Sequence, residues 1–470
     1  MTAVPIFIGG TGSSVGKSWV ATAICRYLHR LGHRVAPFKA QNMSNNSAVC
    51  PDGGEIGRAQ AAQAEACGLE PHTDMNPILL KPTGSLGSQV VLNGRVWKNL
   101  TAREYYGQFD SLLQEVLASY ARLSEQYEFV VIEGAGSITE LNLKHHDLVN
   151  LGLAQRLHAR SILVADIDRG GVFASVVGTF QLLEPEESAL VRSFLVNRFR
   201  GDRSLFQDGV RILEEKTGKP CLGVFPHVPN LDLDAEDSLN LEERANGTGR
   251  VAIVRLPHIS NFTDFRLLPD AAYVTNPTST QFDVIFLPGT KSTIKDMVWL
   301  RESGMEQWLL EQAKRGARIV GICGGYQMLG EEIDDPDGVE SPVPSVRGLG
   351  LIPARTRLMP QKVTRRVTTK TPSGIVFSAY EIHMGITTLS HTLQPFALFE
   401  DGVSDGVRMP GVAGTYLHGA LENKQVLEEL LGHSLPDAHS SKDAQYDRLA
   451  DWFAENVNLP VFLSEYLTKN

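Results

Sequence analysis

One cysteine stands where the chain could place a nucleophile. A β-branched apolar run from Ile319 to Ile322 ends at Cys323, and Gly321 and Gly325 flank this cysteine in a G-x-C-x-G pattern. The pattern predicts a strand, a sharp turn and a helix, which would lift the thiol above the sheet and beside the N–H groups of the helix start. A cysteine after an apolar strand is otherwise most often a core residue, and the two glycines favour the nucleophile.

A thiol nucleophile needs a base, and two histidines compete for this role. His418 follows the short strand that begins at Val412, and Gly419 comes after it, whereas His383 lies in the segment YEIHMG. His418 is better placed because it follows a strand. His418 and Cys323 are distant along the chain, so their pairing depends on how the chain folds.

A glycine-rich loop near the N-terminus has the composition of a phosphate cradle. The apolar run from Val4 to Ile8 opens into it, and apolar residues at helical spacing follow. In a strand, loop and helix of this kind, backbone N–H groups wrap a phosphate, the lysine adds a point charge and the serine hydroxyl can bind Mg²⁺. The expected ATP-binding residues are Gly10, Thr11, Gly12, Ser13, Gly16, Lys17 and Ser18, with Asn197 at the end of a later strand.

An acidic residue ends another apolar run of the same half. Glu133 directly follows the buried-strand pattern from Phe129 to Ile132. A carboxylate at the carboxyl end of a strand beside a phosphate loop is a usual Mg²⁺ ligand. We therefore expect Ser18 and Glu133 to be the protein ligands of Mg²⁺.

Polar loops follow further strands of this half. The strand from Val35 to Phe38 leads into KAQNMSNNS (residues 39–47), and the strand from Ser161 to Ala165 leads into DIDRGG (residues 166–171). Open α/β sheets bind ligands beyond the carboxyl ends of their strands, although each loop alone is more often simply solvated. The substrate-binding candidates are Lys39, Asn42, Ser44, Asn45, Asp147 and Asp166.

At least six strand patterns alternate with helical segments before residue 230. This order predicts an α/β fold, a doubly wound parallel sheet with the nucleotide at its carboxyl edge. The acidic, aromatic-free stretch 231–249 is expected to be a linker, after which the α/β pattern restarts with Val251 to Leu256. We predict two domains, residues 1–230 and 250–470, because 470 residues exceed one ordinary core.

Composition restricts the classes of partner and compartment. The net charge is −10 and no Lys/Arg-rich tract occurs, so nucleic acid and anionic membranes have little support. Five scattered cysteines without a C-x-x-C motif argue against a disulfide framework and a structural zinc site, and favour a reducing compartment. Neither a signal-like start nor an apolar run of membrane-spanning length occurs, so we expect a cytoplasmic protein; the oligomeric state is not indicated.

Several of these motifs together resemble known families. GICGGYQ (residues 321–327) resembles the nucleophile turn of class I glutamine amidotransferases, and GTYLHG (residues 414–419) resembles the histidine segment of their cobyric acid synthase branch. The phosphate loop looks like that of dethiobiotin synthetase. The fusion of both halves, with KAQNMSNNS, ADIDRGG and YEIHMG, is similar to the cobyric acid synthase family from about residue 5 to residue 425.

The resemblance implies an ATP-dependent, glutamine-hydrolysing amidoligase of cobalamin biosynthesis. Cys323 and His418 would release ammonia from L-glutamine, with Gly289, Gly325 and Gln327 at the oxyanion and glutamine-binding positions. In the N-terminal domain, ATP and Mg²⁺ would activate a carboxylate that ammonia then attacks. The implied substrate is a corrinoid polycarboxylate, adenosylcobyrinic acid a,c-diamide, amidated at its b, d, e and g carboxylates.

One departure from the amidotransferase pattern and three alternative functions remain. Many class I amidotransferases have a glutamate two residues after the histidine, where Ala420 stands here, so the sequence does not identify a third catalytic group. The alternatives are cobyrinic acid a,c-diamide synthase, CTP synthase, and a regulatory or scaffold protein with an inactive amidotransferase domain. The KAQNMSNNS loop argues against the first, a UTP-dependent ATPase assay tests the second, and intact Cys323, His418 and Lys17 weigh against the third.

Overall fold

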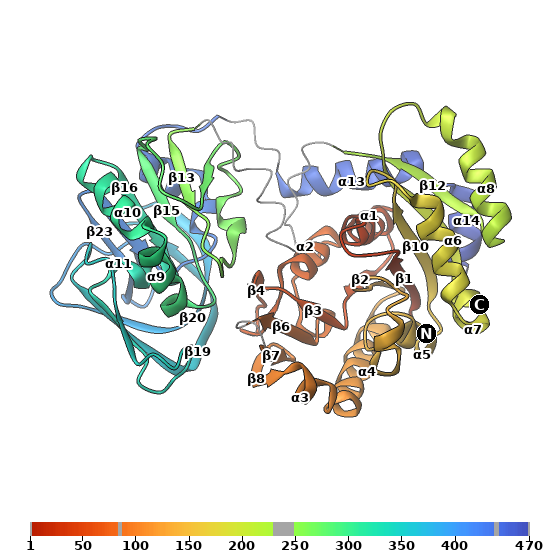
Figure 1. Cartoon of the computed structure of the whole chain (residues 1–470), viewed down its shortest axis with the longest axis horizontal. Helices are drawn as coiled ribbons and strands as arrows, with labels where there is room; N and C mark the ends of the chain where they lie inside the picture. The colour runs from red at the N-terminus through yellow and green to blue at the C-terminus, as the bar shows by residue number, and fades with distance from the viewer. Residues whose placement is uncertain (1, 83–86, 229–248, 437–440, 469–470) are drawn as a thin grey trace.

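Two α/β lobes lie side by side in the computed structural model, which describes residues 2–82, 87–228, 249–436 and 441–468 (Figure 1). The N-terminal lobe contains the phosphate loop and the C-terminal lobe contains Cys323. Residues 231–248 of the expected linker lie outside the described residues. Within the described residues, no helix combines the length and the apolar character needed to cross a membrane.

A parallel six-stranded sheet forms the core of the N-terminal lobe, in the order β12-β11-β10-β1-β9-β2. Its strands are β1 (Val4–Gly10), β2 (Val35–Phe38), β9 (Phe129–Glu133), β10 (Arg160–Asp166), β11 (Val191–Phe199) and β12 (Cys221–Pro226). The helices of this lobe include α1 (Lys17–Arg30), α4 (Phe109–Gln126), α5 (Leu151–Arg156), α6 (Val172–Leu182), α7 (Pro185–Leu190) and α8 (Gln207–Thr217). Near-continuous apolar strands suit a sheet covered on both faces, and the predicted doubly wound sheet is confirmed.

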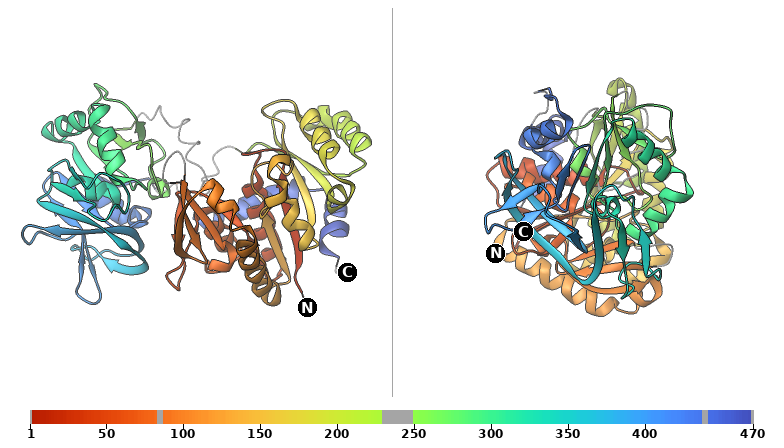
Figure 2. Two further views of the ribbon diagram at one scale, coloured as in Figure 1. Left: turned by 60° about the horizontal axis from the view of Figure 1, so that its bottom comes forward. Right: turned by 90° about the vertical axis from the view of Figure 1, so that its left-hand side faces the viewer.

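A second, four-stranded sheet, β3-β6-β7-β8, is inserted between β2 and β9 and was not predicted. It lies on the side of the N-terminal lobe that faces the C-terminal lobe (Figures 1 and 2). Its strands are β3 (Gln41–Met43), β6 (Ile78–Pro82), β7 (Gly87–Leu92) and β8 (Arg95–Thr101), and around it are β4 (Ser47–Val49), β5 (Glu55–Gly57), α2 (Arg58–Ala66), η1 (Thr73–Met75), α3 (Ala102–Tyr106) and η2 (Leu141–His146). Helix α2 begins at Arg58, because residues 55–57 pair with 47–49 as a strand.

The C-terminal lobe has its own six-stranded sheet, in the order β14-β13-β15-β16-β24-β23. Its strands are β13 (Val251–Val254), β14 (Ala272–Val274), β15 (Val284–Leu287), β16 (Arg318–Ile322), β23 (Val407–Met409) and β24 (Val412–Thr415), with helices α9 (Thr293–Glu302), α10 (Met305–Lys314), α11 (Gly324–Leu329) and α12 (Lys424–Leu431). A further sheet holds β17 (Glu332–Asp334), β18 (Ser345–Arg347), β19 (Ala354–Lys370), β20 (Val376–Leu389), β21 (Ala397–Phe399) and β22 (Ser404–Asp405). Because β13, β15, β16 and β24 run parallel, the loops after them meet at one edge of the sheet.

The C-terminal segment returns to the N-terminal lobe. Helix α13 (Lys442–Asn456) lies beside α1, and α14 (Leu459–Phe462) and η7 (Leu463–Leu467) follow it (Figure 1). Phe453, Phe462 and Tyr466 are buried in the same apolar cluster as the strands and α1 of that lobe. The predicted second domain, 250–470, included this segment; its packing instead joins residues 442–467 to the first lobe.

Candidate functional site

Cys323 occupies a strained turn between β16 and α11. Its φ is 51° and its ψ is −109°, a backbone region that a non-glycine residue rarely adopts. A Cβ at Gly325 would overlap the Leu287 carbonyl oxygen, so the following turn of helix packs too closely on β15 for any larger residue. The predicted strand, sharp turn and helix around the thiol are therefore present.

His418 is held by a carboxylate that the sequence interpretation did not identify. Its Nδ1 lies 2.7 Å from Oδ2 of Asp264, and the Gly419 N–H donates to Oδ1 of the same carboxylate at 2.7 Å. Both side chains are almost completely buried. Asp264 comes from η5 (Phe262–Phe265), in the loop after β13, and so reaches His418 across the carboxyl edge of the sheet. Cys323, His418 and Asp264 thus have the arrangement of a nucleophile, a base and a group that orients the base.

The charge of Asp264 decides the protonation of His418. Burial alone would lower the pKa of the imidazole, but the Asp264 carboxylate and then Cys323 outweigh burial and raise it to about 10. The Nε2 atom is buried and makes no hydrogen bond of standard geometry within the described residues, yet it is close enough to Cys323 for the sulfur to contribute to this rise. The imidazolium is therefore available near neutral pH to stabilise a thiolate or to donate a proton.

The other residues expected around the thiol lie close to it. A Cβ on Gly289 would be 2.9 Å from Cε1 of His418, which places the loop after β15 against the imidazole. Gln327 is buried, accepts a hydrogen bond from the Thr293 hydroxyl at 3.1 Å and donates to the Tyr416 hydroxyl at 3.3 Å. The segments that carry Gly289, Cys323, Gln327 and His418 therefore converge.

His383, the competing base, lies in the same cavity but faces different partners. Its ring stacks on Tyr416 with centroids 3.8 Å apart, and its Nδ1 lies 2.8 Å from the Gly385 carbonyl oxygen. Nε2 lies 3.5 Å from Oε1 of Glu381. These contacts fix His383 as part of the wall, and the shorter contact with Asp264, 2.7 Å against 3.5 Å, favours His418 as the base.

The cavity at Cys323 is narrow and both lobes line it. Its volume is about 40 Å³, and its walls include Gln327, Glu340 and Lys362 of the C-terminal lobe together with Lys81 of β6. Space of this size holds only a few water molecules. The thiol therefore lies at the interface of the two lobes.

A buried ionic cluster joins the lobes at this cavity. Glu55 of β5 contacts the ammonium groups of both Lys81 and Lys362. Burial would raise the pKa of Glu55, but these two cations hold it well below its usual range. Burial lowers the pKa of Lys81 to about 8, and burial together with repulsion by Lys362 and Lys81 lowers that of Lys291 to about 7. Each lysine thus depends on neighbouring carboxylates to remain charged.

Two residues expected from the sequence, Asn197 and Lys17, hold the phosphate loop in place. Gly16 has a φ of +99°, and the amide of Asn197 packs against it and donates to the Val15 carbonyl oxygen at 2.9 Å. The Lys17 ammonium donates to the carbonyl oxygens of Gly12 and Gly136, each at 2.9 Å. Asn197 therefore supports the loop from behind, while Lys17 spans it.

Glu133 is the centre of a polar cluster beside the loop. Its carboxylate accepts hydrogen bonds from Ser18 at 2.8 Å, from Lys39 at 2.9 Å and from Gln63 at 2.5 Å. Burial would raise the pKa of Glu133, but Lys39 and these hydrogen bonds lower it overall. The carboxylate is therefore ionised where a nucleotide's metal would be held.

Ser18 and Glu133 fit the donor set that Mg²⁺ uses at nucleotide sites. Their oxygen atoms are 2.8 Å apart, and Mg²⁺ there takes one or two protein oxygens with phosphate and water for the rest. No group of three or more His, Cys, Asp or Glu residues within the described part of the chain could hold a metal by itself. The pair suits a metal that arrives with a nucleotide.

Three of the remaining substrate-binding candidates, Asn42, Ser44 and Asn45, lie in the polar segment that follows β2. Asn42 donates to Gln60 at 2.8 Å, and the Asn45 side-chain oxygen is buried with no hydrogen-bond partner among the described residues. Ser44 accepts from the Asn46 N–H at 3.0 Å. These contacts leave the Asn45 oxygen as a group that a ligand would satisfy.

Two acidic candidates are engaged within the protein. The Asp147 carboxylate accepts from the N–H groups of Val149, Asn150 and Gly152, and so holds the start of α5. Asp166 accepts from Arg198 at 2.9 Å at the end of β10. A role of either residue in substrate binding stays a prediction.

Sequence reasoning missed Asp264, Gln63 and Lys81. The amidotransferase pattern points to the position two residues after His418, which is Ala420, although the loop after β13 also reaches this edge. The signal for Asp264 is an acidic residue in the loop after β13, the strand next to β15 in the sheet. Gln63 and Lys81 lie in a helix and a strand whose placement depends on the inserted sheet, and nothing in their local sequence marks them.

The fold and the two centres define a class: a nucleotide-binding domain joined to a class I glutamine amidotransferase domain. Residues 6–240 match the CobQ/CobB/MinD/ParA nucleotide binding domain family, and residues 250–426 match the CobB/CobQ-like glutamine amidotransferase domain family. The chain is thus an ATP-dependent, glutamine-hydrolysing amidoligase.

Curated relatives narrow the class to one family. The chain is 44% identical to a cobyric acid synthase of Syntrophobacter fumaroxidans, with 97% of each chain covered. It is 45% identical to one of Bacteroides fragilis, with 99% of each covered, and 41% identical to one of Dehalococcoides mccartyi, with 97% of each covered. The chain belongs to the cobyric acid synthase family.

Proposed function

We propose that the chain uses ATP and L-glutamine to amidate the b, d, e and g carboxylates of adenosylcobyrinic acid a,c-diamide, giving adenosylcobyric acid. The observation that carries this proposal is the cavity at Cys323, which residues of both lobes line, so that ammonia is released at the interface with the nucleotide-binding lobe. Family membership supports the substrate. ATP binds at the phosphate loop, and the protein acts on small molecules.

In the glutaminase half-reaction, the Cys323 thiolate attacks the side-chain amide carbon of glutamine. The imidazolium of His418 donates its proton to the departing ammonia, and Asp264 holds the ring for this transfer. The C–N bond breaks, a thioester forms at the sulfur, and water then releases glutamate. Backbone N–H groups near Gly289 and Gly325 are the proposed oxyanion donors.

In the ligase half-reaction, a carboxylate oxygen of the substrate attacks the terminal phosphorus of ATP, the bond to the β-phosphate oxygen breaks and ADP leaves. This activation is needed because the oxygen of a free carboxylate is a poor leaving group. Lys17 and the loop amides hold the phosphates during this step. Bound Mg²⁺ would neutralise phosphate charge, and Ser18 and Glu133 are its proposed protein ligands. Ammonia then attacks the acyl phosphate and displaces inorganic phosphate.

The proposal extends to surroundings that the sequence suggested. We retain the cytoplasm as the expected compartment, since none of the five buried cysteines takes part in a disulfide. The net charge of −10 continues to give nucleic acid and anionic membranes little support as partners.

Mass spectrometry tests the substrate directly. The protein is incubated with cobyrinic acid a,c-diamide, ATP, Mg²⁺ and glutamine, and carboxyl-to-amide conversions are counted over time. We expect four successive conversions that require ATP. No conversion by a protein with intact glutaminase activity would overturn the corrinoid assignment and direct the search to other carboxylates, beginning with cobyrinic acid.

A further inference from the structure

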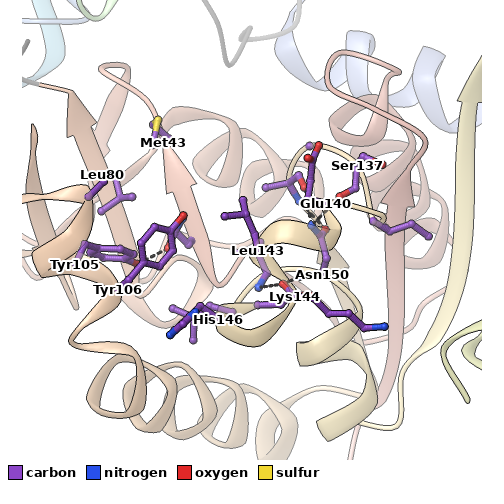
Figure 3. Close-up of a pocket in the computed structure, with 18 of the residues that line it drawn as sticks. Met43, Leu80, Tyr105, Tyr106, Ser137, Glu140, Leu143, Lys144, His146 and Asn150 are labelled. Atoms are coloured by element: carbon purple, nitrogen blue, oxygen red, sulfur yellow. Dashed lines mark hydrogen bonds between the residues drawn. The ribbon is translucent and has the colours of Figure 1, made fainter. Parts of the chain in front are cut away.

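A large cavity lies in the N-terminal lobe, beside the phosphate loop. Its volume is about 640 Å³, within the range of small-molecule sites, which is about 300–1,000 Å³. One wall consists of the inserted sheet and α3, and the other consists of residues 135–151, which follow β9 (Figure 3). Neither motif spacing nor the family motifs identified this cavity.

The lining of the cavity is mainly apolar and open to solvent. Met43 of β3 is 56% exposed and Leu143 of η2 is 41% exposed, and Tyr106 and Leu141 are also exposed large apolar side chains. Figure 3 shows Met43, Tyr106 and Leu143 on facing sides of the space. Several exposed apolar groups around one hollow indicate a surface that a ligand covers.

Charge in the cavity does not suit a ligand held by its carboxylates. Among the described lining residues, Lys144 and His146 carry the basic groups, and Lys144 pairs with Glu187 at 3.0 Å. Asp147 and Glu140 add acidic groups. A polyanion would therefore bind here through an apolar part of its surface, with its carboxylates directed elsewhere.

One end of the cavity reaches the phosphate loop. Asn150 holds the turn after β9, because its side chain donates to the carbonyl oxygens of Ala135 and Ser137 and accepts from the Ala135 N–H. Gly136 in that turn lines the cavity and accepts a hydrogen bond from Lys17. A ligand in the cavity thus has its edge beside the lysine expected to hold the terminal phosphate.

We propose that this cavity is the corrinoid seat: Met43, Tyr106, Leu141 and Leu143 hold the apolar, methyl-bearing part of the macrocycle, while one rim carboxylate faces the phosphate loop. The inference rests on the proposed function. A corrin ring combines a large apolar body with carboxylates spread around its rim, which matches an apolar cavity that ends at a phosphate site. Binding by the ring body also explains how one site can accept carboxylates from several rim positions.

Leu143→Asp and Met43→Asp test the seat, because each places a charge on its apolar lining at a solvent-exposed position. We expect the KM for cobyrinic acid a,c-diamide, measured with ammonia as the nitrogen source, to rise about tenfold or more. Equilibrium dialysis, followed by the corrinoid's own absorbance, should show the same loss of affinity. The KM for ATP and the glutaminase rate should match the wild type.

Two matched variants complete the test. Leu205→Asp changes a leucine that is 83% exposed and outside the cavity lining, and it should leave corrinoid binding unchanged. Met43→Leu keeps an apolar side chain, so any rise in its KM should be smaller than that of Met43→Asp. If wild type amidates the corrinoid and both aspartate variants keep a KM within about twofold of it, the seat is overturned while the proposed function stands. A wild-type protein that neither binds nor amidates the corrinoid overturns both.

Discussion

Cys323 lies in a cavity of about 40 Å³ at the interface of the lobes, whereas the cavity beside the phosphate loop measures about 640 Å³ and is open to solvent. The first is lined largely by charged and polar groups that hydrogen-bond to one another, and the second mainly by apolar side chains, of which Met43, Tyr106, Leu141 and Leu143 are exposed. The fixed groups around Cys323 suit one small reacting group, the side-chain amide of glutamine. A large substrate with several reacting positions requires a roomy surface and a separate, fixed phosphate site.

Cys323→Ala should have the largest effect, because it should abolish the glutaminase activity and leave the ligase activity intact. Without the nucleophile, glutaminase activity and glutamine-dependent amidation should fall by roughly 10³-fold or more. Amidation with ammonium chloride should remain near the wild-type rate, because the phosphate loop is untouched. Loss of both activities in a folded variant would show that the role of the thiol is misassigned.

Lys17→Ala should give the opposite pattern. Amidation should fall by about 10³-fold with either nitrogen source, since carboxylate activation precedes both. Glutaminase activity in the same preparation serves as the internal control. Continued ATP-dependent amidation would contradict the assignment of the loop.

Asp264→Asn tests the group that orients His418. The amide keeps the volume but removes the charge that raises the imidazole pKa, so the glutaminase rate should fall by about 10²- to 10⁴-fold. Because the pKa of His418 is raised to about 10, wild-type activity should persist as pH rises until it approaches that value. The variant should lose its residual activity at a lower pH. A pH profile with an unchanged alkaline limb would limit Asp264 to a structural role.

Glu55→Gln should weaken the interface between the centres. The substitution leaves Lys81 and Lys362 buried without their shared carboxylate, which costs about 3–5 kcal/mol when a buried ion pair is broken. Thermal unfolding should show this loss, and fewer amides should form per glutamine hydrolysed. If the variant is destabilised but forms as many amides per glutamine as the wild type, the ionic cluster contributes only to stability.

Arg366→Ala is the matched control for Glu55→Gln and should have the smallest effect. Arg366 pairs with Glu70 across the same interface, but both side chains are largely exposed. Exposed ion pairs contribute about 1 kcal/mol or less, so thermal unfolding and the amide-to-glutamate ratio should stay close to the wild type. A loss as large as that of Glu55→Gln would show that burial does not distinguish the two pairs.

The sequence by itself determined the features that depend on a few neighbouring residues. The turn at Cys323 and the loop from Gly10 to Ser18 were recognisable because glycines, an apolar strand and a following helix dictate their backbone locally. The parallel strands of the first lobe were predictable for the same reason, since apolar runs of strand length identify buried strands.

Only the tertiary structure decided which distant groups meet. Asp264 is 154 residues from His418 along the chain, and it reaches the imidazole because the loops after β13 and β24 meet at the same edge of the sheet. Lys81 enters the glutaminase cavity because the inserted sheet turns toward the other lobe, and the C-terminal helix α13 crosses back to α1. Such contacts depend on how whole elements pack, and apolar packing is too non-directional for a local pattern to specify the partner.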